Sequence, residues 1–316
     1  MHLLILGCSS IVTRRVLPAA LACGRIHRIS LASRTTADSP VPDRVTLYRD
    51  YDDAINASGA DVAYVSGVNA AHAEWIARAL TAGLHVMVDK PAVLDVASAE
   101  SVVALARRVR RGIGEATVFA FHPQIAALRA LVPPADLAST RATASFSVPP
   151  LPPSDFRYRH ELGGGSLYDL GPYAAATSRL LFGEAPATVA CMVLSTRGAP
   201  AVDTSFSMLL TYPGGGSLAG HYGFVTTYQN RLSVLSGSRV VDAERIFSTP
   251  PELACAIRVR EPEGERIVAV PAADAFTLFL EAFTAAVDRG DFEAFESALL
   301  EDARLIARLR DASRHT

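Results

Sequence analysis

Short apolar segments alternate with longer amphipathic segments over the first 120 residues. The apolar segments read HLLILG, RISLAS, DVAYVS, LHVMVD and ATVFAF. Their apolar residues are consecutive rather than alternating, which is typical of parallel strands that are covered by helices on both faces. The intervening segments VTRRVLPAALACG, AAHAEWIARALTAG and DVASAESVVALARRVRRG place apolar residues at helical spacing and end in glycine. Residues 1–120 are therefore predicted to form a doubly wound Rossmann domain with a parallel sheet.

The pattern changes beyond residue 120. A helical segment (QIAALRAL), a proline-rich connection (VPPLPPSD) and a glycine-rich segment precede a series of strands that are separated only by turn residues. The predicted strands are ATVACMVLSTR, TSFSMLLTYP, SLAGHYGFVT, RLSVLSG, CAIRVR and RIVAVP. Strands joined by short turns favour an antiparallel sheet. Two helical segments, 274–290 and 291–313, follow. We predict that residues 121–316 form an α+β domain with a large, mostly antiparallel sheet and helices on one face.

Composition excludes several classes of function. The 30 basic and 32 acidic residues give a formal net charge of −2, which provides no basic surface for nucleic acid or an anionic membrane. No signal peptide and no apolar run of transmembrane length are present, and the four cysteines show no paired spacing. We therefore expect a cytoplasmic protein. The eight histidines show no metal-ligand spacing, so we predict no metal site. The sequence contains neither a glycine-rich phosphate-binding loop with lysine nor a serine nucleophile elbow, which disfavours a kinase or a hydrolase.

The loop after the first strand, GCSSIV, lies where a dinucleotide-binding fold needs backbone close to a pyrophosphate at a helix N-terminus. Gly7 holds the first glycine position of the motif, whereas Ser9 and Val12 replace the second and third glycines. The alternative is a tight strand-to-helix turn with no ligand. In this loop Cys8 is a small filler rather than a reactive thiol. The residues assigned to cofactor binding here are Gly7, Cys8, Ser9, Ser10 and Ile11.

The end of the second strand indicates which dinucleotide is bound. An acidic residue at this position usually binds the ribose 2′-hydroxyl and would repel a 2′-phosphate. Here Ser33 and Arg34, followed by Thr35, replace the acid and offer a hydroxyl and a guanidinium to a phosphate monoester. The alternative is a solvated surface arginine. We predict NADP.

The chain contains three motifs in sequence order: GVNAAH (67–72), ALTAGLHVMVDKP (79–91) and GGGSLYDLGPY (163–173). With these motifs in this order, the chain resembles the glucose-fructose oxidoreductase and inositol dehydrogenase (Gfo/Idh/MocA) family. The resemblance covers essentially the whole chain. Within the family the chain looks most like the ketoreductases of nucleotide-linked deoxysugars, because of GCSSIVTRRVLPA, ASRTT and DAERIFSTPPE. Asp89, Val68 and Tyr173 depart from the glutamate, proline and histidine that are common in the family, and the last departure affects the chemistry.

Lys90 is the only lysine in the chain, beside 29 arginines. The resemblance implies that its ammonium lies beside the nicotinamide and reaches the substrate oxygen, where it can polarise a carbonyl and supply a proton. Arginine, with its far higher pKa and planar fork, would do this poorly. The alternative is a chance survivor of a general drift from lysine to arginine. Asp89 either holds the ammonium in place or is a solvated turn carboxylate.

Asp169 and Tyr173 are four residues apart, so both project from one face of a helix. Pro172 either begins that helix or lies in a kinked turn. We predict that the Tyr173 phenol donates the proton and that Asp169 orients a sugar hydroxyl or the phenol. The alternative is an amphipathic helix with a buried tyrosine. The glycine run 163–165 would let backbone come close to a ligand or to the other domain.

Other polar side chains are weaker candidates. Ser66 ends the DVAYVS segment, and Asn69 and His72 follow it, where cofactor contacts are expected. Asn69 is equally suited to cap a helix. His122 and Gln124 are candidate substrate ligands, or packed residues of the domain junction. Arg157 and Arg159 could hold a diphosphate, or be solvated loop arginines.

These observations predict an NADPH-dependent reductase of a keto group on a sugar that is carried by a nucleotide. The alternatives are a dehydrogenase of a free sugar or cyclitol, and a non-catalytic NADP-binding sensor. The resemblance implies that the second domain binds the substrate and forms a homodimer or homotetramer through its sheet. No nucleic-acid or membrane partner is expected.

Overall fold

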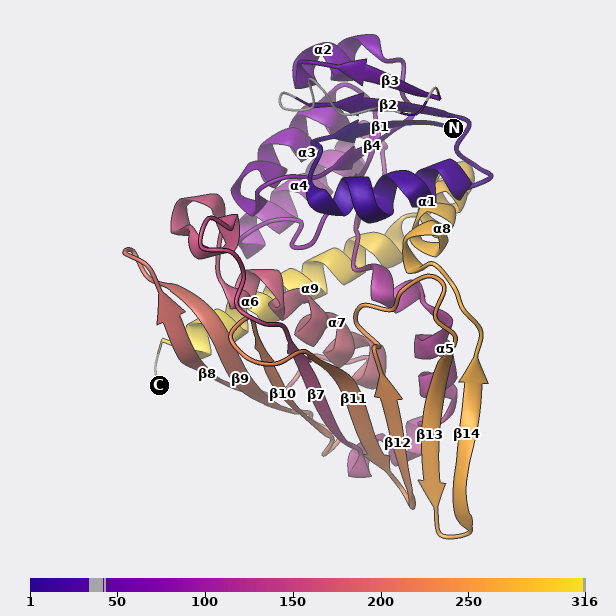
Figure 1. The fold of residues 1–316 in the computed structure, drawn as a ribbon, viewed down its shortest axis with the longest axis vertical. Helices are drawn as coiled ribbons and strands as arrows, with labels where there is room; N and C mark the ends of the chain where they lie inside the picture. The colour runs from indigo at the N-terminus through magenta and orange to yellow at the C-terminus, as the bar shows by residue number, and fades with distance from the viewer. Residues whose placement is uncertain (34–41, 43, 315–316) are drawn as a thin grey trace. The chain divides into compact units, whose positions relative to one another are not determined.

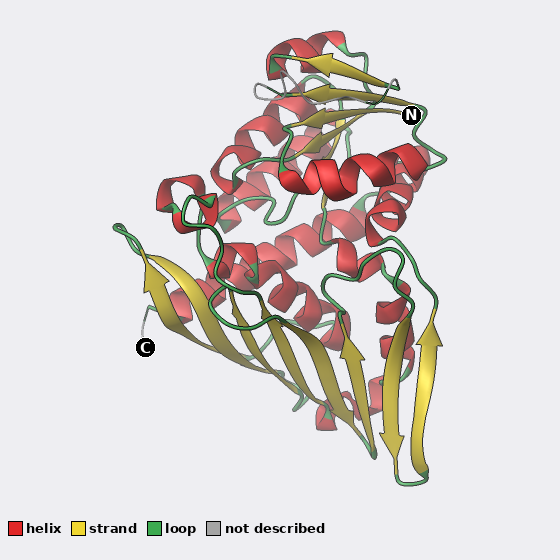
Figure 2. Cartoon of the chain, in the orientation of Figure 1, coloured by secondary structure: helices red, strands yellow, loops and turns green. Residues whose placement is uncertain are grey.

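The computed structural model describes residues 1–33, 42 and 44–314. The chain divides into two compact units (Figures 1 and 2). The first comprises Met1–Ala116 with Phe276–Leu300, and the second comprises Thr117–Ala275 with Glu301–Thr316. The chain thus passes from the first unit to the second, back to the first, and ends in the second.

The described part of the first unit is built on a six-stranded sheet in the order β3-β2-β1-β4-β5-β6, and every pair in it is parallel. This strand order and pairing are those of a dinucleotide-binding Rossmann fold, so the predicted fold class is confirmed. The central strand is buried along its whole length, as its run of aliphatic residues predicts. The strands are β1 (His2–Leu6), β2 (Arg28–Ala32), β3 (Val45–Tyr48), β4 (Val62–Val65), β5 (His85–Val88) and β6 (Ile113–Glu115).

Helices cover both faces of this sheet. Figure 1 shows α1 in front of the strands and α3 and α4 behind them, as right-handed crossovers from a central strand require. Asp95 caps α4, its carboxylate accepting from the Ser98 N–H at 2.8 Å, and Arg110 ends that helix in a left-handed conformation. The helical segments are η1 (Val12–Val16), α1 (Leu17–Ala22), α2 (Tyr51–Ala57), η2 (Asn69–Ala71), α3 (His72–Thr81) and α4 (Val96–Val109).

The two closing helices are α8 (Ala275–Arg289) and α9 (Glu293–Ala312). A single boundary near residue 120 would place both in the second unit, but Phe276–Leu300 belong to the first. The reason is a cluster of aromatic rings against strand β6. A Cβ on Gly112 would lie 2.1 Å from the Phe292 ring, and one on Gly114 would lie 2.9 Å from the Phe295 ring. The two glycines therefore provide the space in which these rings pack.

One predicted strand of the first domain is wrong. The apolar segment ATVFAF (116–121) does not extend the sheet, because β6 ends at Glu115 and residues Val118–Phe121 form the 3-10 helix η3. Phe119 is buried in the core of the second unit. The segment is apolar because it enters another core, and a short apolar run does not distinguish this use from a strand. Strand β3 and helix α2 were not anticipated by the pattern.

The described part of the second unit is built on an eight-stranded sheet in the order β14-β13-β12-β11-β7-β10-β9-β8. Its strands pair antiparallel except for β7 and β10, which are parallel, so the prediction of a mostly antiparallel sheet is confirmed. The strands are β7 (Arg141–Ser147), β8 (Thr188–Arg197), β9 (Val202–Thr211), β10 (Ser217–Gly223), β11 (Gln229–Ser236), β12 (Arg239–Glu244), β13 (Cys255–Glu261) and β14 (Gly264–Val270). The sequence pattern had not indicated β7 and β12.

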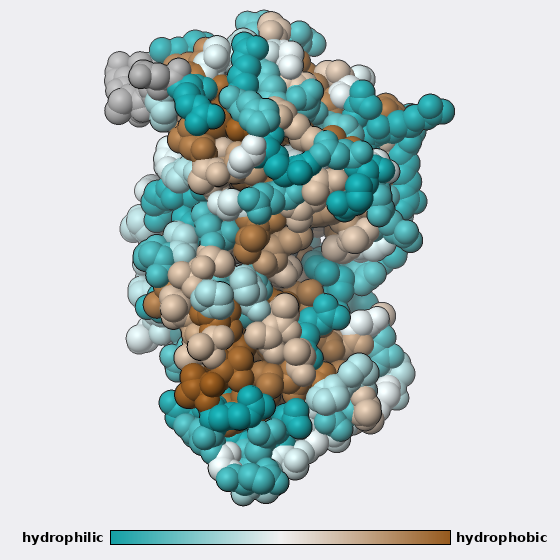
Figure 3. All heavy atoms as spheres, turned by 90° about the vertical axis from the view of Figure 1, so that its right-hand side faces the viewer, coloured by the Kyte–Doolittle hydropathy of each residue, from teal (hydrophilic) through white to brown (hydrophobic). Residues whose placement is uncertain are grey.

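Within the second unit the helices lie on one face of the sheet (Figure 1). Strand β11 alternates between exposed and buried residues, as a sheet with one covered face requires. The hydropathy surface in Figure 3 shows apolar side chains gathered on part of this unit. None of the described helices is both long and apolar enough to cross a membrane. The helical segments are η3 (Val118–Phe121), α5 (Pro123–Ala130), η4 (Pro134–Ser139), η5 (Phe156–Tyr158), η6 (His160–Leu162), α6 (Ser166–Asp169) and α7 (Gly171–Phe182).

The packing of Phe292 against Gly112 gives a stability prediction. Gly112→Ala places a methyl group inside the volume of the Phe292 ring and should lower the free energy of unfolding by about 1–3 kcal/mol, the usual cost of overpacking. Gly24→Ala is the matched control, because nothing lies within 4 Å of its added Cβ. Thermal unfolding of both variants measures the difference, and equal stability of the two would show that the aromatic cluster can move aside.

Candidate active site

The carboxyl ends of three adjacent strands bring together the polar residues of the first unit. Gly7 follows β1, Ser66 follows β4 and Asp89 follows β5, and these strands are neighbours in the sheet. Because all three run in the same direction, their following loops emerge at one edge, the edge at which ligands of open parallel sheets bind.

Gly7 allows the first loop to approach the β4 loop closely. Its φ is +104°, and a Cβ there would lie 1.9 Å from the Ser66 carbonyl oxygen. A residue with a side chain would clash with this backbone and would also be strained. The chain then enters a continuous helix over residues 10–22, in which Ser10 is exposed and Ile11 is half-buried. Half-buried Cys8 follows Gly7, and burial raises the pKa of its thiol, which suits the filler role. The helix N-terminus directly after this loop fits a dinucleotide pyrophosphate.

A chain of hydrogen bonds joins the three loops. The Ser9 and Ser66 hydroxyls lie 2.8 Å apart, and the Ser66 hydroxyl donates to Asp89 Oδ2. The Tyr64 hydroxyl donates to Asp89 Oδ1 at 2.5 Å. Asp89 is half-buried and both of its oxygens accept hydrogen bonds, so the alternative of a solvated turn carboxylate does not describe it. The prediction that Asp89 holds the Lys90 ammonium stays a prediction.

The residues that flank Lys90 are held by buried or partly buried side chains. The His72 ring donates from Nδ1 to the Pro91 carbonyl oxygen at 2.8 Å, and the Ala92 N–H donates to Glu115 Oε2 at 2.7 Å. His72 is 1% exposed, and burial lowers the pKa of its imidazole. The ring is therefore a neutral donor beneath the turn. Lys90 itself is half-buried and is joined to Pro91 by a cis peptide bond.

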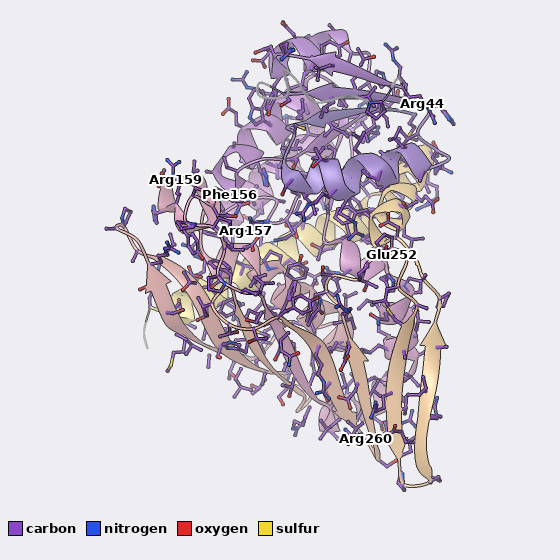
Figure 4. All side chains as sticks on the ribbon, viewed as in Figure 1. Arg44, Phe156, Arg157, Arg159, Glu252 and Arg260 are labelled. Carbon is purple, nitrogen blue, oxygen red and sulfur yellow. The ribbon has the colours of Figure 1, made fainter. Side chains whose placement is uncertain are left out.

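Two further candidates of the first unit are buried. Asn69 is the first residue of η2, and the N-cap positions of η2 and α3 are Val68 and Ala71, neither of which has a side-chain capping bond. Asn69 therefore does not occupy the N-cap position of either helix. Ser33 follows β2, is 2% exposed, and its N–H donates to the Tyr48 carbonyl oxygen at 3.0 Å. Arg34 and Thr35 lie outside the described residues. Arg44, labelled in Figure 4, precedes β3 and so lies at the opposite, amino edge of the sheet.

Tyr173 lies near the start of α7 in the second unit, with Pro172 in the first turn of that helix. The helix-start alternative for Pro172 is thus the one observed. Asp169 ends the short helix α6, and Leu170 separates the two helices. The Tyr173 ring is half-buried among three phenylalanines, with ring centroids 5.7 Å from Phe119, 4.8 Å from Phe146 and 5.8 Å from Phe247. This apolar setting fixes the ring in position.

Asp169 and Arg157, predicted as separate ligands of a sugar and a diphosphate, form an ion pair. Arg157 Nε lies 2.9 Å from Asp169 Oδ2, and Arg157 Nη1 lies 3.3 Å from Asp155 Oδ1. The charge of Asp169 is the main cause that raises the pKa of Arg157. Figure 4 shows Arg157 beside Phe156 and Arg159 in the same segment. Arg159 is exposed and paired with Glu161 at 2.7 Å. A guanidinium between two carboxylates carries less net positive charge toward an anion than a free one.

The glycine run packs against its own unit. A Cβ on Gly164 would lie 2.6 Å from the Arg157 carbonyl oxygen, and one on Gly165 would lie 2.5 Å from Asp203 Oδ1. Asp203 also accepts from the Ser166 hydroxyl and the Leu167 N–H, both at 2.6 Å. It therefore holds the first turn of α6 and was missed by the sequence analysis, because an aspartate in a strand far along the chain gives no local sign of this contact.

His122 and Gln124 are buried in the second unit. His122 Nδ1 accepts from the Gln124 N–H at 3.2 Å and so caps α5, and burial lowers the pKa of the ring. Gln124 Nε2 donates to the Glu244 carbonyl oxygen at 3.1 Å. Both residues are at most 1% exposed, which favours the packed alternative over substrate contact. Among the described residues no group of three or more His, Cys, Asp or Glu side chains could hold a metal ion.

Two family models match the chain, an oxidoreductase family with an NAD-binding Rossmann fold over residues 1–114 and the GFO/IDH/MocA C-terminal domain over residues 136–239. The chain belongs to the GFO/IDH/MocA oxidoreductase family. This confirms the resemblance on which the sequence-based assignment depended.

Within this family, the chain is similar along most of its length to enzymes that are named as sugar 3-reductases. The chain is 32% identical over 291 residues to a dTDP-3,4-didehydro-2,6-dideoxy-α-D-glucose 3-reductase from Saccharopolyspora spinosa, covering 90% of this chain and 87% of the relative. It is 30% identical over 321 residues to the enzyme of the same name from Streptomyces violaceoruber, covering 97% and 94%. A 3-ketoreductase from Actinomadura kijaniata, solved as a tyrosine-to-phenylalanine variant with TDP-benzene and NADP, superposes with a TM-score of 0.89 at 26% identity and covers 99% and 97% of the two chains.

The Arg157–Asp169 pair gives a second prediction. Arg157→Met removes the guanidinium that lies 2.9 Å from the largely buried Asp169 carboxylate, so the free energy of unfolding should fall by about 1–3 kcal/mol. The double variant Arg157→Met/Asp169→Asn should recover most of this loss, because it also removes the buried negative charge. A double-mutant cycle from chemical denaturation measures the coupling between the two residues. Additive effects of the two substitutions would contradict a structural ion pair and would favour separate ligand contacts.

Proposed function

We propose that this protein is an NADPH-dependent reductase of a keto group on a nucleotide-linked deoxysugar. The observation that carries the proposal is the full-length similarity to dTDP-sugar 3-reductases and to a 3-ketoreductase whose structure holds both NADP and TDP-benzene. The loop geometry at the carboxyl edge of the first unit is consistent with it, because Gly7 lets the first loop pack against the Ser66 backbone directly before a helix begins at residue 10.

The chain supplies two kinds of contact to the cofactor. When bound, NADPH provides a hydride from nicotinamide C4 to the carbonyl carbon of the substrate. Ser9 and Ser10, with the backbone that follows Gly7, would bind the pyrophosphate at the start of the helix over residues 10–22. Ser33 would lie beside the ribose at the end of β2, with Arg34 and Thr35 assigned to the 2′-phosphate from the sequence alone.

Tyr173 and Lys90 are the proposed sources of the proton. The Tyr173 phenol donates to the carbonyl oxygen as hydride arrives at carbon, and the Lys90 ammonium polarises that oxygen and stabilises its developing charge. The A. kijaniata enzyme was also solved with a single lysine replaced. The lysine and the tyrosine that were replaced in that enzyme are separated by the same number of positions, to within one, as Lys90 and Tyr173. This spacing supports the assignment of the two roles.

The substrate contacts are proposed from the Arg157–Asp169 ion pair and from the position of Asp169 beside Tyr173. Asp169 lies one turn before Tyr173 and is held by Arg157, so it can accept from a sugar hydroxyl while its orientation stays fixed. Arg157 would then act on the substrate through Asp169 rather than through a phosphate. His122 and Gln124 stay candidates only if substrate binding exposes them, because both are buried in the described structure.

The proposed function is tested by the oxidation of NADPH at 340 nm with a panel of nucleotide-linked 3-keto and 4-keto deoxysugars. Turnover of a dTDP-linked keto sugar is expected. Oxidation of a free sugar or cyclitol by NADP instead would support the dehydrogenase alternative. Binding of NADPH without turnover of any substrate would support the sensor alternative.

Variants of the two proton sources sharpen this test. Lys90→Arg keeps a positive charge but not its reach, so turnover should fall by about a hundredfold or more with the fold retained. Tyr173→Phe removes only the hydroxyl, so single-turnover hydride transfer at saturating keto sugar should slow by about a hundredfold while NADPH affinity stays nearly unchanged. Tyr158→Phe is a control for loss of a tyrosine hydroxyl in the same unit. An unchanged single-turnover rate in Tyr173→Phe would assign the acid role to Lys90.

We further propose that the protein forms a homo-oligomer through the exposed face of the second unit's sheet. Five large apolar side chains on its strands are about half exposed, a surface that a soluble monomer rarely leaves uncovered. They are Met192 (50%), Leu194 (50%), Leu209 (47%), Leu235 (47%) and Ile267 (55%). A cytoplasmic location remains a prediction from composition.

The oligomer proposal predicts a change in mass on substitution. Leu209→Glu places a carboxylate among the exposed apolar side chains of this face, on strand β9, and should shift the protein toward monomer in sedimentation velocity runs. Ala104→Glu adds the same charge to an exposed position of α4 in the first unit and should leave the mass unchanged. A wild-type protein that sediments as a monomer at all concentrations would contradict the proposal.

A further inference from the structure

The strand that contains Tyr64 is otherwise aliphatic. Strand β4 reads VAYV and is buried at every position, and the Tyr64 side chain is 0% exposed. A phenol in such a setting needs a hydrogen-bond partner, since an unpaired buried hydroxyl is costly. Its partner is the carboxylate of Asp89, the residue directly before Lys90.

The Asp89 carboxylate is oriented by two hydroxyl donors. Tyr64 donates to one oxygen at 2.5 Å and Ser66 donates to the other. Burial and the charge of Asp89 raise the pKa of Tyr64 well above its ordinary value, so the phenol keeps its proton and remains a donor. Two charge-assisted hydrogen bonds therefore partly neutralise the carboxylate directly before Lys90.

Other groups hold the remainder of the turn. His72 from α3 donates to the Pro91 carbonyl oxygen, and Glu115 from β6 accepts from the Ala92 N–H. The titratable groups whose described contacts reach the turn are therefore Tyr64, His72, Asp89 and Glu115. Tyr64 is distinct among these groups because it acts directly on the carboxylate beside Lys90. Among the described residues, the hydrogen bond of its side chain goes to Asp89.

We infer that Tyr64 is a positioning residue for Lys90: its buried phenol fixes the Asp89 carboxylate directly before the lysine and so sets the charge that the lysine ammonium experiences. Ser66 shares this role and links the carboxylate to Ser9 in the proposed cofactor loop. The inference rests on the proposed function, in which Lys90 contributes to the proton step. Without the phenol, the carboxylate would carry more negative charge toward the ammonium and would stabilise its protonated form.

The single lysine allows a direct test in the cofactor-free, full-length protein. Growth on ¹³C-lysine labels one side chain, so the Cε resonance of Lys90 can be followed alone as pH is raised. Tyr64→Phe should raise the pKa of Lys90 by about half a unit or more, because the Asp89 charge is less neutralised. Tyr222→Phe is the matched control: this tyrosine is also 0% exposed but lies in the second unit, and its loss should leave the Lys90 titration unchanged.

Two further variants keep the test decisive. Ser66→Ala removes the second donor and should move the Lys90 titration in the same direction, so the inference can be judged even if Tyr64→Phe fails to fold. Ser66→Thr keeps the hydroxyl and should restore the wild-type titration. With keto sugar, Tyr64→Phe should slow single-turnover hydride transfer by about tenfold with little change in NADPH affinity.

The outcomes separate this inference from the proposed function. A Lys90 titration that is identical in wild type, Tyr64→Phe and Ser66→Ala would overturn the inference, whether or not the wild type reduces keto sugars. A shifted titration in a protein that reduces none of the tested sugars would support the positioning of Lys90 and reject the proposed reaction.

Discussion

The parallel hydrogen bonding of β1, β4 and β5 is the constraint on which the site in the first unit depends. Neighbouring parallel strands end at the same edge, so the residues after each strand meet although they are far apart in sequence. Ser9, Ser66 and Asp89 become hydrogen-bonded neighbours for this reason alone. A slip of one residue in either pairing would turn Tyr64 to the other face of the sheet and break its bond to Asp89.

This arrangement explains how a half-buried lysine can be kept in a defined place. Buried ionic and polar groups are costly unless their hydrogen bonds are satisfied. The turn that contains Lys90 is held by two neutral donors, the phenol of Tyr64 and the imidazole of His72, and by the Glu115 carboxylate, which accepts from the Ala92 N–H. Neutral donors fix the geometry of the turn without adding a second cation, which would repel the ammonium. Arginine at position 90 would bring a larger group with five donors into a turn that is built around one ammonium.

The second unit uses a different principle to place Tyr173. Three phenylalanine rings surround the tyrosine, and Asp203 and the glycine run fix the short helix before it. The Arg157–Asp169 ion pair then sets the direction of the carboxylate one turn away. Apolar packing holds the ring, whereas ionic contacts hold the polar groups beside it. The two proposed proton sources are thus supported by unrelated parts of the chain.

The sequence by itself determined the fold class, the family and the residue types that carry the chemistry. Uniformly apolar strands, glycine-terminated helices and the DKP and GGGSLYDLGPY motifs are local patterns, and local patterns can be read without coordinates. Tertiary structure alone decided which polar groups pair. These pairs join different elements of the fold, so their spacing in the sequence does not predict them. The pairs are Tyr64 with Asp89, Arg157 with Asp169, and Asp203 with Ser166. It also decided that ATVFAF enters the core of the second unit and that the phenylalanines of α8 and α9 cover β6, because an apolar run shows that a segment is buried but not what buries it.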